Sequence, residues 1–385
     1  MKKICITTAT RAEYGLLRPL IKAIHEHPIF QLQLLVTGAH LSPEFGLTKN
    51  FILQDGYTID EEVEMLLSSD TSIGISKSMG LGLIGYAEAF NRLKSDAVVI
   101  LGDRYEMLAM ASAAIIAKLP IIHLHGGEIT EGAYDDAIRH AITKLSYLHF
   151  TSTEDYRNRV IQMGEHPDRV FNVGAIGIDN INTLSLLSKD ELESNLNVKF
   201  KRFNYQITFH PETLSEISSE EQFNNLLESL DKEEDSFFVF TKANADTDGR
   251  IINSLIDEYV SKSKEKAVAY HSLGALRFLS LVKVCDAIIG NSSSGILEAP
   301  SLNTITINIG DRQKGRIQAK SIINCNNSIQ SISEAIKKSK ETDFKEVVNC
   351  VSNPYYNGGA VDKIIQTLEI HKDKFKVVKH FNDIV

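Results

Sequence analysis

Short apolar runs alternate with amphipathic stretches of helical period along the first half of the chain. Each run is followed by a polar turn and then by apolar residues three or four positions apart. The expected strands are residues 4–8, 32–37, 97–101, 121–124, 148–151 and 170–173. These runs are apolar throughout, which indicates a parallel sheet covered by helices on both faces. The first half therefore predicts a doubly wound α/β domain.

The same pattern starts again after a polar, charged interval at residues 185–204. The second set of expected strands is 206–209, 237–241, 267–270, 287–289 and 304–307. A length of 385 residues also favours two domains. We predict two Rossmann-like domains, the first formed by residues 1–174 with 366–385 and the second by 175–365. The stretch 360–381 has helical character and is a candidate for a helix across the domain junction.

Composition narrows the class of protein. The chain is 43% hydrophobic and 24% charged, and it has no apolar run of the length that a membrane span needs. A net charge of -9 argues against non-specific binding of nucleic acid, so a phosphate-bearing ligand needs a focused site. The four cysteines lie far apart, and the apolar stretch after Met-Lys-Lys is too short for a signal peptide. We expect a cytoplasmic protein without disulfides or structural zinc.

Residues 80–85 read Gly-Leu-Gly-Leu-Ile-Gly and match the dinucleotide-binding pattern G-x-G-x-x-G. They follow the polar segment 68–78 and not a strand, so the strand-to-helix turn that this pattern needs is missing. We therefore expect a helix surface of small residues that packs against a neighbour.

Ligands of open α/β sheets bind outside the carboxyl ends of the strands, so chemistry is expected in the turns that follow. Arg11 stands at the start of a helix after the first strand. N–H groups and a guanidinium suit an anion, and a helix cap with a solvated arginine is the alternative. After strand 97–101, Gly102 allows close approach of a ligand. Asp103 beside it is a candidate general acid or base, the alternative being an N-cap of the next helix.

The densest group of candidates is residues 121–128, Ile-Ile-His-Leu-His-Gly-Gly-Glu. Side chains alternate along a strand, so His123 and His125 are expected to point the same way and to be able to chelate a metal. For His123 we favour a core histidine bonded to a backbone group. A metallohydrolase is an alternative, although the spacing of H-E-x-x-H is absent. It would draw further donors from Asp103, Glu128 and His210.

A helix is expected to begin near Asp135, four residues before Arg139, so that the two share a helical face. An ordinary surface ion pair has the same spacing.

In the second half, His210 follows the first expected strand and Asn244 follows the second. Residues 289–298 form a Gly/Ser-rich turn from strand to helix, whose N–H groups and hydroxyls suit a phosphate. This turn is neither a Walker loop nor a nucleophile elbow. Glu298 suits two ribose hydroxyls better than a phosphate, and Arg312 follows the next strand. A phosphate-binding domain facing a domain with carboxylates and histidines suits an enzyme that acts on a nucleotide sugar.

Several long motifs in order resemble the UDP-N-acetylglucosamine 2-epimerases over nearly the whole chain. The chain looks most like their hydrolysing branch, which supplies N-acetylmannosamine for sialic acid. The motifs that carry the resemblance are TRAEYG (10–15), LGDRYE (101–106), HLHGGE (123–128), DDAIRHAITKLS (135–146), FHPET (209–213), NAD (244–246), GNSSSGILEAPSL (290–302) and INIGDRQKGR (307–316). The resemblance implies a fold of the glycosyltransferase-B type, in which two domains face a central cleft and a C-terminal helix returns to the first.

The resemblance also implies roles for single residues. Asp103 and Asp135 match catalytic carboxylates, and His210 matches a histidine near the diphosphate. Arg104 and Arg139 are further candidates for contact with the substrate. The positions similar to the family's UDP contacts are Arg11, Ser292, Ser293, Glu298 and Arg312, with weaker matches at Asn244 and Phe278.

Two positions depart from the family's pattern. Many members have a catalytic glutamate where this chain has His125, so either His125 or Glu128 is expected to take that proton-transfer role. Gly15 stands where relatives have a polar side chain that contacts the ligand.

The implied reaction converts UDP-N-acetylglucosamine and water to N-acetylmannosamine and UDP, with no metal and no redox cofactor. UDP leaves C1 as the C2 proton is removed, and water and a proton then add to the unsaturated sugar. The expected partners are the UDP-sugar, UDP and further copies of the chain in a dimer or tetramer, without nucleic acid or membrane.

The nearest alternative is a hydrolysing 2-epimerase that acts on UDP-2,4-diacetamido-2,4,6-trideoxyglucose in legionaminic acid synthesis. A non-hydrolysing epimerase, a glycosyltransferase and a non-catalytic nucleotide-sugar sensor are weaker alternatives.

Overall fold

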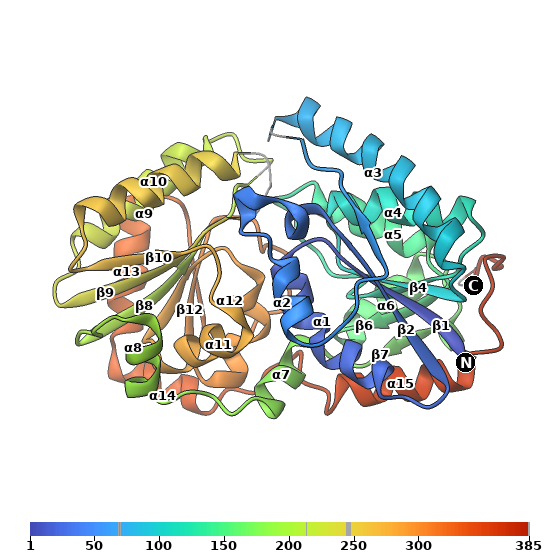
Figure 1. Ribbon diagram of the computed structural model, residues 1–385. Helices are drawn as coiled ribbons and strands as arrows, with labels where there is room; N and C mark the ends of the chain where they lie inside the picture. Colours follow the sequence, from blue (N-terminus) through green and yellow to red (C-terminus); the bar gives the residue numbers. More distant parts are fainter. Residues whose placement is uncertain (68, 70, 213, 244–247, 384–385) are drawn as a thin grey trace. The chain divides into compact units, whose positions relative to one another are not determined.

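The computed structural model describes residues 1–67, 69, 71–212, 214–243 and 248–383, which form two compact units (Figure 1). Unit 1 consists of Met1–Glu128, Asp135–Asp179 and Tyr355–Val385, and unit 2 of Ile129–Tyr134 and Asn180–Pro354. The C-terminal part of unit 1 thus begins before the boundary at 366 drawn from the sequence. Its helix α15 (Ala360–His371) contributes Ile364 and Leu368 to the core of unit 1. Among the described residues, no helix is long and apolar enough to span a membrane.

Unit 1 contains a parallel sheet of seven strands in the order β3-β2-β1-β4-β5-β6-β7. The strands are β1 (Lys2–Thr8), β2 (Phe30–Thr37), β3 (Glu61–Val63), β4 (Ala97–Leu101), β5 (Ile121–Leu124), β6 (Leu148–Thr151) and β7 (Val170–Asn172). The order reverses between β1 and β4. In a doubly wound sheet this reversal is the switch point, where the loops diverge and a ligand binds.

Apolar residues cover both faces of this sheet. In β1, Ile4 and Ile6 belong to a core formed with α1 and α15, whereas Cys5 belongs to a core formed with α3 and α4. The helices of this part of the chain are α1 (Arg11–His25), α2 (Lys49–Gln54), α3 (Ser72–Leu93), α4 (Tyr105–Ile116), α5 (Asp135–Leu145), α6 (Glu154–Gln162) and α7 (Gly177–Thr183). Burial on both faces explains why the strands read as apolar runs without alternation.

Unit 2 repeats the arrangement with a parallel sheet of six strands in the order β10-β9-β8-β11-β12-β13. Its strands are β8 (Phe203–Thr208), β9 (Ser236–Thr241), β10 (Ala267–Tyr270), β11 (Ala287–Gly290), β12 (Ile305–Ile309) and β13 (Ile322–Cys325). Its helices are α8 (Lys189–Leu196), α9 (Ser219–Asp231), α10 (Gly249–Lys262), α11 (Gly274–Val284), α12 (Ser293–Leu297), α13 (Ile329–Ser339) and α14 (Thr342–Asn349). The switch point lies between β8 and β11. The predicted fold class, two doubly wound α/β domains, is confirmed.

The Gly-Leu-Gly-Leu-Ile-Gly segment lies inside α3, so its interpretation as a packing surface is confirmed. A Cβ atom at Gly82 would lie 3.0 Å from the ring of Tyr86, and one at Gly85 would lie 2.5 Å from Cγ1 of Val63. Gly82 and Gly85 therefore allow close packing at α3, and no strand-to-helix turn is present at this position.

Candidate functional site

Asp103 lies at the switch point of unit 1, directly after β4. Arg104 and not Asp103 is the N-cap residue of α4, so the alternative role of Asp103 as a helix cap is wrong. The Asp103 carboxylate instead pairs with the guanidinium of Arg139. Gly102, at φ +74°, has open space where a Cβ would stand, so the turn leaves room beside Asp103.

Arg139 is the buried centre of this part of the site. It is 1% exposed, and it also donates to the backbone oxygen of Glu128 at 2.9 Å and pairs with Asp136 at 3.6 Å. A buried guanidinium with three such contacts fixes the positions of its neighbours. The contact of Arg139 with a substrate stays a prediction. Asp135 starts α5 on the same turn of helix as Asp136.

His125 does not continue the alternation of β5. The strand ends at Leu124, and His125 adopts φ +64°, so the expectation that it points the same way as His123 is wrong. The backbone N–H of His125 donates to the backbone carbonyl of Phe150 at 2.8 Å. A non-glycine residue with positive φ is strained, and such strain often marks functional sites.

The two glycines after His125 return the chain so that Glu128 lies beside the His125 ring. A Cβ at Gly126 would lie 3.0 Å from the His123 ring, and one at Gly127, with φ +80°, would lie 2.5 Å from the carbonyl oxygen of Tyr156. Only glycine fits a position with both a positive φ and so close a backbone. His125 Nδ1 and Glu128 Oε1 are consequently 2.8 Å apart.

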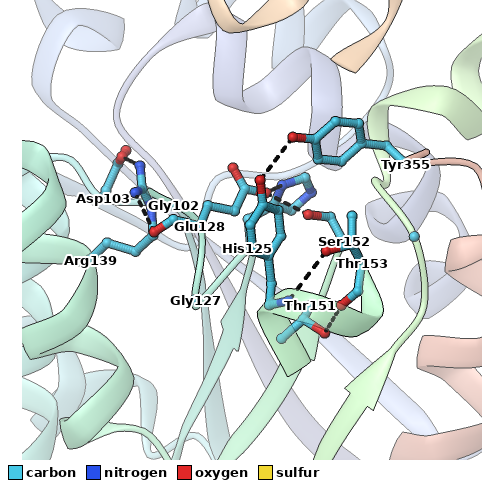
Figure 2. A network of polar contacts seen from close by, with 12 residues as sticks. Gly102, Asp103, His125, Gly127, Glu128, Arg139, Thr151, Ser152, Thr153 and Tyr355 are labelled. Carbon is cyan, nitrogen blue, oxygen red and sulfur yellow. Dashed lines mark hydrogen bonds and ion pairs between the residues drawn. The ribbon is translucent and has the colours of Figure 1, made fainter. Parts of the chain in front are cut away.

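Figure 2 shows these residues as one polar network, with Asp103 and Arg139 on one side of Glu128 and His125 and Ser152 on the other. Ser152 follows β6 and donates its hydroxyl to Glu128 Oε1 at 2.7 Å. This serine was not among the residues singled out from the sequence. The available signal was its place at the end of the strand next to β5.

His123 is a core histidine, as the sequence suggested. It is fully buried, and its Nε2 lies 2.7 Å from the backbone oxygen of Gly102 while Nδ1 lies 3.2 Å from the Thr143 hydroxyl. Burial lowers the pKa of His123 to about 3. Among the described residues, no group of three or more His, Cys, Asp or Glu side chains is arranged to hold a metal ion.

Arg11 and Arg104 lie at the starts of α1 and α4 on either side of the switch point. The Arg11 guanidinium lies 4.1 Å from the centre of the Phe51 ring, and Arg104 forms a two-pronged ion pair with Glu106 at 2.9 and 3.1 Å. Glu13, in the same helix as Arg11, completes a capping box with Thr10. Burial raises the pKa of Glu13 to about 7.

In unit 2, Asn291 lies in the loop after β11 and binds residues of the loops after β8 and β12. Its amide accepts from the His210 N–H at 2.7 Å and donates to the His210 carbonyl at 2.8 Å. Its own carbonyl accepts from Arg312 at 3.1 Å and from Gln313 at 2.8 Å. Gly290, at φ +138°, precedes it, and a Cβ there would lie 1.9 Å from the carbonyl oxygen of Thr208. The loops after β8, β11 and β12 are therefore held together at the switch point.

Glu212 adds a second connection, since its buried carboxylate accepts from the N–H groups of Asp311 and Arg312 at 2.9 and 3.2 Å. Burial raises the pKa of this carboxyl group.

The serine turn opens α12, with Ser292 as its N-cap residue. α12 has only five residues, so the phosphate site predicted here depends on N–H groups and hydroxyls and not on a long helix dipole. Glu298 is buried at the end of α12. Phe278 is partly buried and packs against two core clusters of unit 2. Asn244 lies outside the described residues.

Doubly wound sheets with polar groups gathered at the switch point are typical of proteins that bind nucleotides and their derivatives. The chain belongs to the UDP-N-acetylglucosamine 2-epimerase family, whose model matches residues 22–369.

Curated relatives agree with this assignment, and a solved structure has the same fold. The chain is 45% identical to the GDP/UDP-N,N'-diacetylbacillosamine 2-epimerase (hydrolyzing) of Campylobacter jejuni, over 95% of this chain and 94% of that protein. It is 40% identical to polysialic acid biosynthesis protein P7 of Escherichia coli, over 100% of this chain and 98% of that protein. The fold is similar to that of the UDP-GlcNAc 2-epimerase from Neisseria meningitidis bound to UDP-GlcNAc, with a TM-score of 0.79, 20% identity, and coverage of 96% of this chain and 100% of that one.

Proposed function

We propose that the chain is a hydrolysing 2-epimerase that converts a UDP-linked 2-acetamido sugar and water to the free 2-epimeric sugar and UDP. The observation that carries the proposal is the group of titratable side chains at the switch point of unit 1 and after the neighbouring strand β5. Asp103, His125, Glu128 and Asp135 all belong to the loops after β4 and β5 or to the start of α5. Membership of the epimerase family supports the same reaction.

The proposed reaction begins with elimination. A base removes the C2 proton, the bond between C1 and the diphosphate oxygen breaks, and a double bond forms between C1 and C2. The C2 proton has no adjacent carbonyl group to acidify it, so departure of UDP must lower the barrier. Unit 2 is proposed to stabilise the growing diphosphate charge through His210, Arg312 and the serine turn.

Hydration completes the reaction. Water adds its hydroxyl to C1, and a proton returns to C2 from the opposite face, which inverts that carbon. Two faces of one carbon require two proton-transfer groups, and this explains why several titratable residues surround one site.

UDP-N-acetylglucosamine is the substrate expected from the sequence, with N-acetylmannosamine as the product. The UDP-linked 2,4-diacetamido-2,4,6-trideoxyglucose is a second candidate, supported by the 45% identity to the relative from C. jejuni, whose name contains this sugar as diacetylbacillosamine.

Proton NMR in deuterated water tests the proposal. The protein is incubated with each nucleotide sugar and excess EDTA, and the GDP-linked diacetamido sugar is included because the relative's name contains both nucleotides. The expected result is nucleoside diphosphate together with a free sugar that carries deuterium at an inverted C2. Among the three nucleotide sugars, the one with the highest kcat/KM identifies the physiological substrate. No turnover of any of the three, or turnover that stops with EDTA and returns with zinc, would overturn the proposal.

A further inference from the structure

The Glu128 carboxylate receives two hydrogen bonds on one oxygen. Ser152 Oγ lies 2.7 Å and His125 Nδ1 lies 2.8 Å from Glu128 Oε1. An ionised carboxylate only accepts, so both partners must donate. The proton of a neutral His125 ring is therefore on Nδ1, and Nε2 carries the lone pair.

The other ring nitrogen of His125 has no hydrogen-bond partner among the described residues. Nε2 is buried, and the side chain is 9% exposed. Buried polar atoms are normally paired, and leaving one unpaired costs about 1–3 kcal/mol. Together with the positive φ of His125, this is a second unfavourable feature at one residue. Both features are explained if Nε2 is kept available for a ligand.

The surrounding charges favour the same arrangement. Glu128 is 1% exposed, so its negative charge acts on the ring with little screening by water. Arg139 binds the backbone oxygen of Glu128 and the carboxylate of Asp103, and His123 is neutral because burial lowers its pKa to about 3. A carboxylate that orients an imidazole and stabilises its protonated form is the arrangement that makes histidine an effective base.

We propose that Ser152 and Glu128 are positioning residues that fix the tautomer of His125, and that His125 Nε2 removes the C2 proton of the sugar. This assignment rests on the proposed function. In the elimination step the C2–H electron pair forms the C1–C2 double bond, the C1–O pair leaves with UDP, and the proton passes to Nε2. The resulting imidazolium is stabilised by Glu128. Asp103 and Asp135 then serve the opposite face of C2.

Substitution of Ser152 tests the assignment by a split between catalysis and binding. Ser152→Ala is expected to lower kcat on the order of tenfold and to leave KM and the affinity for UDP within about twofold. It is also expected to raise the isotope effect measured with C2-deuterated substrate, because proton removal becomes slower than the other steps. Glu128→Gln is expected to lower kcat by about 100-fold or more, since the amide no longer fixes the tautomer. Ser152→Thr keeps the hydroxyl and is expected to restore kcat.

Ser146→Ala is the matched control. Ser146 is also a fully buried serine of unit 1, and its hydroxyl donates to the carbonyl of Ile142 at 2.7 Å, within α5 and its end. This variant is expected to lose stability without any change in the isotope effect. A Ser152→Ala protein with the kcat and isotope effect of the unsubstituted protein, or with the same response as Ser146→Ala, would overturn the assignment.

A measurement without substrate separates this assignment from the proposed reaction. In protein labelled with 15N-histidine, the His125 signals, identified by their loss in His125→Gln, are expected to show the tautomer protonated at Nδ1. Glu128→Gln is expected to move the population toward the tautomer protonated at Nε2. A ring already protonated at Nε2 in the unsubstituted protein would overturn the positioning role, whereas absence of turnover by that protein would overturn the proposed function instead.

Discussion

At the scale of single residues, Asp103 combines a carboxylate at the switch point with one buried cationic partner, Arg139. Asp103→Asn keeps the size of the side chain and an oxygen for Arg139, but removes the negative charge and the basic oxygen. Turnover is expected to fall by about 100-fold or more, with binding of UDP retained. Product formation and calorimetric titration with UDP measure the two effects.

Asp136→Asn is the control for this prediction, because Asp136 also pairs with Arg139, at 3.6 Å, and is more exposed. It is expected to keep most of the turnover. Unsubstituted rates in Asp103→Asn would contradict the role of Asp103.

Glu13 leads to a prediction about stability and pH. Burial raises its pKa to about 7 in the folded protein, against about 4.5 in the unfolded chain. The folded state therefore binds this proton more tightly, so its contribution to stability is complete below about pH 4.5 and disappears as the pH rises to about 7. Glu13→Gln keeps an oxygen for the N–H groups of Ala9 and Thr10 and removes the titration.

The variant is therefore expected to gain about 1–3 kcal/mol of unfolding free energy relative to the unsubstituted protein between pH 5 and pH 8. Urea unfolding at the two pH values measures the difference. An equal pH dependence in both proteins would show that Glu13 ionises without penalty.

Sequence reasoning found the residue types of the site more easily than their orientation. The sequence pattern predicted Asp103 and Glu128 to follow strands, because the end of an apolar run marks the end of a strand. It did not predict the positive φ of His125 or the contact from Ser152. Both depend on how β5 and β6 align and how Gly126 and Gly127 pack against other elements, which are tertiary properties.

At the scale of elements, α3 carries four glycines with different surroundings. Gly80 has nothing within 4 Å of a Cβ position, whereas Gly85 faces Val63. Gly80→Ala is expected to stabilise the protein by about 0.5–1 kcal/mol, because alanine loses less backbone entropy in a helix. Gly85→Ala is expected to destabilise it by about 1–3 kcal/mol through overpacking.

Melting temperatures of the two variants, compared with the unsubstituted protein, measure these opposite effects. Shifts in the same direction would mean that helix propensity, and not close packing on β3, decides the outcome at both positions.

How well the bounds of a strand or helix could be predicted depends on its length and on its position in the sheet. Strands β4, β5, β6 and β10 have the predicted bounds, because each is a short, mainly apolar run that is followed by a polar residue or a glycine. Strands β3 and β13 were not predicted; they are short edge strands, and β3 is Glu-Glu-Val. The helical stretch expected to reach residue 381 ends at His371. Beyond it, Lys379 binds Glu165 and the Ser146 carbonyl, contacts that no local pattern encodes.

At the scale of the whole molecule, the two units are expected to respond differently to UDP. If unit 2 holds the nucleotide, saturating UDP will slow hydrogen exchange in the loops after β8, β11 and β12, where Asn291 and Glu212 already connect the strands. The loops after β4 and β5 in unit 1 are expected to exchange at their original rates.

Hydrogen exchange followed by mass spectrometry measures this difference, and UDP at 100 times its Kd stabilises its site by about 2.7 kcal/mol. Equal slowing in residues 102–104 and 125–128 would place the nucleotide on unit 1 as well. Heating with and without UDP gives an independent measure of the same binding.

The chain leaves unit 1 at Glu128 for the six residues Ile129–Tyr134 of unit 2, returns at Asp135, and comes back once more at Tyr355. Neither unit is thus a continuous stretch of gene. A single crossover between the genes of two relatives, within the part that encodes Asn180–Pro354, takes the sheet of unit 1 from one parent and α15 from the other. Ile364 and Leu368 of α15 must nevertheless fit the same core as Leu17 and Leu20. New sugar specificities in this family are therefore expected to arise by substitution within the strand-end loops more readily than by exchange of whole domains.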